Sequence, residues 1–126
     1  MTVCLIDGLH TYRQSLRDVL NASDWMHPHG VIVVDDCNPK TLDRANPTPT
    51  GKAWNGEVWK TMATLKSTQP QWSVRTLDTD EGVGLVLGFQ NKRSNVSDLD
   101  IASFDALDFS HLQKHPEIVG LQAAGG

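Results

Sequence analysis

Acidic residues and a histidine follow two apolar segments of the chain, and these residue types suit metal binding and proton transfer. Asp7 and His10 come soon after the first apolar run, and Asp35 and Asp36 come directly after the second. Carboxylates that share a small volume repel one another unless a proton or a cation neutralises them, and Mg²⁺ prefers such oxygen ligands. A histidine whose pKa is about 6.5 can accept a proton at neutral pH. The pattern indicates a metal-assisted site with a general base.

A plainer interpretation of the same residues stays open. Aspartates are common turn formers, so Asp7, Asp35 and Asp36 also suit solvated turns at the ends of strands. His10, which stands alone before a helical pattern, also suits a capping or surface position. The choice between a site and a set of turns depends on where the fold places the two apolar runs.

The elements around these residues predict that the carboxylates meet at one edge of a sheet. Residues 3–6 and 31–34 are continuous apolar runs, typical of parallel strands covered on both faces. Between them, helical spacing predicts a helix over residues 12–23, opened by a capping box of Thr11 and Gln14. A βαβ unit makes the two strands parallel, and ligands bind beyond the carboxyl ends of such strands.

The rest of the chain predicts a loop, a second helix and a hairpin. Residues 37–53 are rich in proline and polar residues, which is typical of a binding loop, and Asn55 is a suitable cap for a helix after it. Residues 72–77 alternate and residues 83–87 are apolar, with a turn signal between them. We therefore expect an α/β fold: a parallel βαβ unit, then a helix and an antiparallel C-terminal hairpin.

This unit is expected to occupy residues 1–90, followed by a loosely structured tail over residues 91–126 with a short helix near residues 104–112. The tryptophans at positions 54, 59 and 72 are expected to cover the core rather than to stack on a ligand, because aromatic residues contribute mainly through buried area.

Composition narrows the class of protein. The chain has 126 residues, 39% of them hydrophobic, which suits one domain, and its net charge of -4 has the wrong sign for a nucleic-acid partner. It has neither an apolar run of the ~20 residues that span a bilayer nor a secretory signal, so we expect no membrane partner. Cys4 lies in an apolar strand and Cys37 in a polar turn, without CxxC spacing. We expect neither a disulfide nor a zinc site, and a cytoplasmic location.

Four segments, taken in order, resemble the C-terminal half of class I S-adenosylmethionine-dependent methyltransferases, in the small-molecule O-methyltransferase-like branch. That branch keeps IDGxH near the fourth strand of a Rossmann-like fold and an acidic pair after the fifth. The resemblance covers about residues 2–88. The segments are Ile6-Asp7-Gly8-x-His10-x-Tyr12, the helix with Ser15-Leu16-Arg17-Asp18, Gly30 to Pro39, and Trp54 to Lys60.

The resemblance implies that the chain opens at the fourth strand of a partial Rossmann-like fold, without the strands and the glycine-rich loop that hold the cofactor. We expect a fragment of a longer protein; a degenerate domain that needs another chain is the other possibility. The implied sheet order is residues 3–6, 31–34, 83–87 and 72–77, with the 83–87 strand antiparallel to its neighbours.

The resemblance also implies roles for the residues quoted above. Asp7 and Gly8 would lie beside the methionine end of S-adenosylmethionine, and Asp7, Asp35 and Asp36 would hold Mg²⁺ in metal-dependent members of the family. The ion would orient a substrate hydroxyl and lower its pKa.

His10 would then accept the hydroxyl proton, while Asn38 and Trp54 would lie near a small-molecule acceptor under the loop of residues 37–53. The implied function is methyl transfer to a hydroxyl of a small molecule by the intact parent. The alternative is a non-catalytic α/β module that pairs with itself, as a homodimer, or with another chain through the exposed edge of its first strand.

Overall fold

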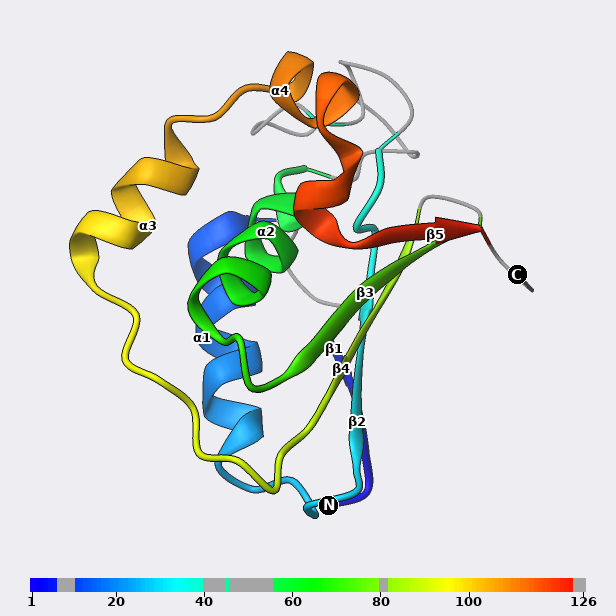
Figure 1. Cartoon of the computed structure of the whole chain (residues 1–126), viewed down its shortest axis with the longest axis vertical. Coiled ribbons are helices and arrows are strands. Elements are labelled where there is room, and N and C mark those ends of the chain that lie inside the picture. The colour runs from blue at the N-terminus through cyan, green and yellow to red at the C-terminus, as the bar shows by residue number, and fades with distance from the viewer. Residues whose placement is uncertain (7–10, 40–44, 46–55, 80–81, 124–126) are drawn as a thin grey trace.

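A computed structural model of the chain describes residues 1–6, 11–39, 45, 56–79 and 82–123. Helices and strands alternate along residues 3–78, after which a strand, three short helices and a final strand follow (Figure 1). Within the described residues no helix combines the length and the apolar content needed to cross a membrane. The elements are β1 (Val3–Ile6), α1 (Tyr12–Ser23), β2 (Val31–Asp35), α2 (Val58–Thr68), β3 (Ser73–Asp78), β4 (Val83–Leu87), α3 (Asp98–Asp105), α4 (Phe109–Lys114), the 3-10 helix η1 (Pro116–Val119) and β5 (Leu121–Ala123).

The strands form one mixed sheet in the order β1-β2-β4-β3-β5. β1 and β2 pair in parallel and are connected by α1, and β4 runs antiparallel to both β2 and β3. The predicted α/β class, the order of the first four strands and the reversed direction of β4 are therefore confirmed, and the arrangement is consistent with a partial Rossmann-like fold. β5, which pairs in parallel with β3, was not predicted.

Helix α1 forms where its apolar spacing predicts, but it begins differently from the prediction. Leu16 is 2% exposed on the face that meets the sheet. The predicted capping box is wrong: the side chain of Thr11 makes no capping hydrogen bond. Gln14 Nε2 donates instead to Asp18 Oδ1 at 2.8 Å, because that carboxylate lies one turn along the same helix face. The apolar stripe, and not the cap, sets the position of α1.

Among the described residues, helices cover one face of the sheet. Figure 1 shows α1 and α2 against one face, with α3 beyond them. Side chains on that face are buried, as Val34 and Val86 are at 0% exposure, whereas Val3 and Leu5 of the edge strand β1 are each 62% exposed. The prediction that β1 is covered on both faces is therefore wrong for the described part of the chain. The apolar pattern predicted that this segment forms a strand, but it contains no information on how many faces of the strand are covered by other elements.

The contact between α1 and α2 is polar, although both helices are buried there. The Tyr12 hydroxyl lies 2.6 Å from Thr64 Oγ1, and Ser15 Oγ lies 2.5 Å from Thr61 Oγ1. All four residues are 2% exposed or less. Because buried hydroxyls are costly unless they are hydrogen-bonded, these pairs select one register between the helices.

The segment before α3 is held more firmly than a loose tail. Gln69, with no exposed surface, donates from Nε2 to Ser94 O at 2.8 Å and accepts from Ser94 N at 2.6 Å through Oε1. Trp72 Nε1 donates to Asn91 O at 3.1 Å. The single short helix predicted near residues 104–112 is wrong in its bounds, because the structure has two helices, α3 and α4, separated by residues 106–108. The prediction missed most of α3, whose N-terminus is closed by a reciprocal capping box of Ser97 and Asp100. The polar composition of the segment before α3 gave no sign of its order, because Gln69 and Trp72 bind its backbone groups rather than its side chains.

We expect Gln69→Ala to release this segment to protease. Trypsin cleaves after Lys92 and Arg93, which lie beside the clamped Ser94. Loss of two buried hydrogen bonds favours local opening, so the initial cleavage rate there should rise about tenfold or more. Limited trypsinolysis followed by mass spectrometry measures this rate. Gln113→Ala, at an exposed position on α4, is the matched control; equal cleavage of both variants would contradict the clamp.

Candidate functional site at the carboxyl edge of the sheet

Four parallel strands, β1, β2, β3 and β5, end at the same edge of the sheet. The register pairs Ile6 with Val34, so β1 and β2 end side by side. β3 is parallel to β2, because both are antiparallel to β4, and it ends at Asp78. β5 is parallel to β3 and pairs Ala123 with Asp78, so the edge where ligands bind in open α/β sheets is formed by the ends of β1, β2, β3 and β5.

Asp35 and Asp36 make a sharp turn at the end of β2. The Asp36 N–H donates to Asp35 Oδ1 at 2.9 Å, and Asp36 adopts a φ of 62°, in the left-handed region that few residues other than glycine and asparagine or aspartate enter. Both residues are half-buried. One oxygen of Asp35 thus has a structural role, and its other oxygen is the part of this carboxylate that a ligand can use.

Cys37 follows this turn and is fully buried, which corrects its assignment to a polar turn. Its thiol donates to Val34 O at 3.2 Å, and its N–H donates to Gly82 O at 3.1 Å. Burial raises the pKa of the Cys37 thiol strongly, against a smaller lowering by the Gly84 backbone, and the carboxylates of Asp35 and Asp36 raise it further. The thiol therefore stays protonated at neutral pH and packs as an apolar group.

Asn38 is held against the turn between β3 and β4. Its Nδ2 donates to Asp78 Oδ1 at 3.4 Å. Gly82 has a φ of 90°, and a Cβ on it would lie 2.4 Å from the Cβ of Asn38, so no larger residue fits there. Asp78 is a further carboxylate at this edge that sequence reasoning missed, since it was counted as part of a turn signal. Because β2 and β3 were predicted to be parallel, their carboxyl ends were expected at the same edge, and this relation could have identified Asp78.

Several of the predicted site residues lie outside the described residues. These are Asp7, Gly8, His10 and Trp54, together with most of the loop of residues 37–53. The structure brings Asp35, Asp36 and Asn38 to one edge and leaves the roles of the others as predictions. Among the residues that it describes, no group of three or more His, Cys, Asp or Glu side chains is arranged to hold a metal ion. The pair after β2 therefore needs a further ligand to bind one.

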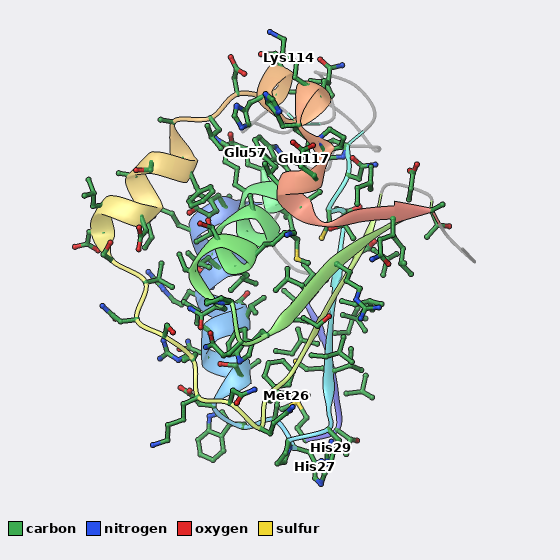
Figure 2. All side chains as sticks on the ribbon, viewed as in Figure 1. Met26, His27, His29, Glu57, Lys114 and Glu117 are labelled. Carbon is green, nitrogen blue, oxygen red and sulfur yellow. The ribbon has the colours of Figure 1, made fainter. Side chains whose placement is uncertain are left out.

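The described histidines either lie far from this edge or belong to α4 and its C-terminal end. Figure 2 shows His27 and His29 at the end of the molecule opposite to Glu57. They precede β2, at the amino end of the strands. His111 and His115 lie in α4 and at its C-terminal end, with ring centroids 5.0 Å apart. His27 and His29 are therefore excluded as bases at the carboxyl edge.

A buried lysine at the start of α2 was also missed. Lys60 is 2% exposed, pairs with Glu57, and donates from Nζ to Asp105 O at 2.7 Å. It thereby joins the first turn of α2 to the last residue of α3. A buried ammonium group needs such partners, and its role here is to hold the elements next to the carboxyl edge.

Comparison with known proteins bears on the N-terminal part of this site. Residues 1–37 match the family model described as a methyltransferase domain. The βαβ unit is similar to a methyltransferase domain. The match includes β1, α1 and β2 with both aspartates of the turn, and it supports the methyltransferase resemblance for this part of the chain. No curated protein and no solved structure matched the chain.

Proposed function

We propose that this chain is part of an S-adenosylmethionine-dependent methyltransferase that transfers a methyl group to a hydroxyl of a small molecule. The observation that carries the proposal is the match of residues 1–37 to a methyltransferase domain, over the same unit whose strands end in acidic residues at a ligand-binding edge. S-adenosylmethionine supplies the electrophilic methyl group when it is bound.

The proposed roles come from the methyltransferase resemblance and from the places of these residues in the sequence. Asp7 follows Ile6 directly in the sequence, and Ile6 is the register partner of Val34 beside the Asp35 turn. We assign Asp7 and Gly8 to the cofactor side of the edge, and His10 to removal of the hydroxyl proton during attack on the methyl group. Asn38 and Trp54 would lie beside the acceptor, where positioning of the oxygen in line with the methyl group lowers the barrier.

The residues present suit Mg²⁺ in chemical type. Asp35 and Asp36 offer carboxylate oxygens, one of which already accepts the Asp36 N–H, so a third ligand is needed. Asp7 is the residue that we propose for it. A bound cation would supply the charge that lowers the pKa of the substrate hydroxyl.

The open edge of β1 supports a role within a longer methyltransferase domain, and it also favours the second candidate. β1 is the terminal strand of the sheet and, among the described strands, pairs with β2 alone, so its other edge can pair with further strands of a parent protein. The same edge suits self-association of a non-catalytic module. Light scattering after size exclusion separates the two: a dimer that persists at low micromolar concentration without methyltransferase activity would favour the module.

The test of the proposed function uses the open reading frame extended in frame upstream of Met1. We expect the extended protein to transfer a labelled methyl group from S-adenosylmethionine to small hydroxylated acceptors, and calorimetry to detect cofactor binding. The 126-residue chain alone should show no binding, since its own residues include no glycine-rich cofactor loop between a strand and a helix. A micromolar Kd for the chain alone would contradict this assignment of the cofactor half.

A further inference from the structure

A cleft of about 320 Å³ lies between α1 and α3. Its apolar lining comes from Leu16 and Leu20, one turn apart on α1, and from Ile101 of α3. The cleft exists because α3 packs loosely: none of its residues is buried, and Leu99 is 77% exposed. Ligand pockets range from about 300 Å³ upward, so the cleft has the size for a small molecule.

Arginine side chains surround this apolar lining. Arg13 and Arg17 lie one turn apart on α1, Arg93 comes from the segment before α3, and Asp98 is the acidic residue in the lining. Counted over its lining residues alone, the cleft has three arginines against one aspartate, while Asp105 and Asp24 outside the lining pair with Arg13 and Arg93. Among the described residues, the unpaired positive charge is that of Arg17, in a chain whose net charge is -4. A positive charge in a concave surface concentrates anions there.

The guanidinium groups are available to a ligand. The structure gives Arg17, an exposed residue, no ion pair within the part of the chain that it describes. Arg13 pairs with Asp105 at 3.3 Å and Arg93 with Asp24 at 3.2 Å, and these side chains are between 35% and 66% exposed. Ion pairs with that exposure contribute little to stability, so a bound anion can replace them at low cost.

We propose that the cleft between α1 and α3 binds a small amphiphilic anion, with a carboxylate or phosphate monoester head against Arg13, Arg17 and Arg93 and a short apolar chain against Leu16, Leu20 and Ile101. The planar guanidinium fork matches the oxygen geometry of both head groups. The apolar lining removes the chain of the ligand from water. Binding at this place does not depend on the methyltransferase proposal.

Calorimetric titration of the 126-residue chain with octanoate and with octyl phosphate tests the proposal. We expect at least one of these anions to bind with a Kd below about 1 mM, and the preference between them identifies the head group. Octanol and octyltrimethylammonium share the chain but lack the anion, and acetate and inorganic phosphate share the head but lack the chain. Each of the four should bind at least about tenfold more weakly than the preferred anion.

Arg17→Gln is the informative variant, because Arg17 makes no ion pair that the fold needs. It should weaken binding of the preferred anion about tenfold. Arg75→Gln, an exposed position on β3 outside the cleft, removes the same charge and should leave binding unchanged. Ile101→Trp should block the apolar chain, with circular dichroism as the check of folding. Equal binding of octanol, equal loss in both arginine variants, or no binding of either anion would overturn the proposal.

Discussion

Replacement of Asp35 by asparagine, in a methyltransferase that contains this chain, is expected to lower methyl transfer about a hundredfold. The asparagine carbonyl can still accept the Asp36 N–H, which Asp35 Oδ1 now accepts at 2.9 Å, so the turn survives while the charge is lost. Asp36→Asn has the same logic, because asparagine tolerates the left-handed φ of 62°. Turnover measured across a range of Mg²⁺ concentrations should show that both variants need more of the ion.

His10→Ala should separate proton transfer from metal binding in the same assay. We expect turnover to fall by about 10²–10⁴-fold, as for loss of a general base, with the Mg²⁺ dependence nearly unchanged. The decisive comparison is activity with and without EDTA. Undiminished methylation in the chelator would rule out the metal and leave His10 as the candidate for the chemistry. If the aspartates only form turns, their asparagine variants should instead change stability by a few tenths to about one kcal/mol and leave turnover intact.

Trp59→Ala is expected to lower the free energy of unfolding by about 3–5 kcal/mol. Trp59 is 1% exposed, among the largest fully buried side chains, so its truncation leaves a cavity in the core beside α2 that cannot collapse fully. Trp25→Ala is the matched control, since Trp25 is 76% exposed and its removal should change stability by less than about 0.5 kcal/mol. Urea denaturation followed by circular dichroism measures both.

The same pair of variants tests the interpretation of the tryptophans as core residues. The burial of Trp59 and Trp72 confirms that interpretation for these two, while Trp54 lies outside the described residues. A Trp59→Ala protein with unchanged stability and weakened acceptor binding would show that the side chain stacks on a ligand instead. A Trp25→Ala protein as unstable as Trp59→Ala would show that exposure does not decide the effect.

The sequence by itself determined which segments become strands and helices along the first two thirds of the chain. The runs at β1 and β2 are apolar over consecutive residues, and α1 repeats its apolar positions every three or four residues, so each pattern allows one element. The same local rules predicted the β3–β4 hairpin from the turn signal between an alternating run and an apolar run. The acidic turn at Asp35 and Asp36 was predictable as well, because the two aspartates directly follow the apolar run and so mark where the strand ends.

Tertiary structure decided everything that depends on distant partners. Whether β1 is covered on both faces, whether Cys37 is buried, and whether Ser94 is held depend on groups that come from other parts of the chain, such as Gly82 for Cys37 and Gln69 for Ser94. Local periodicity carries no information on those contacts. The reason is physical: burial and hydrogen bonding belong to pairs of segments, and a pattern along one segment reports only its own conformational preference.

The cleft between α1 and α3 is a further case of this distinction. Arg13 and Arg17 were visible as neighbours on one helix, but Arg93 and Ile101 come from a segment more than seventy residues later, which sequence reasoning treated as loose. The docking of that segment beside α1 brings these side chains together, through the hydrogen bonds of Gln69 to Ser94 and the contacts of Lys60 and Arg13 with Asp105. The sequence therefore determined the helix that carries one wall of the cleft, and these long-range contacts decided that a second wall exists.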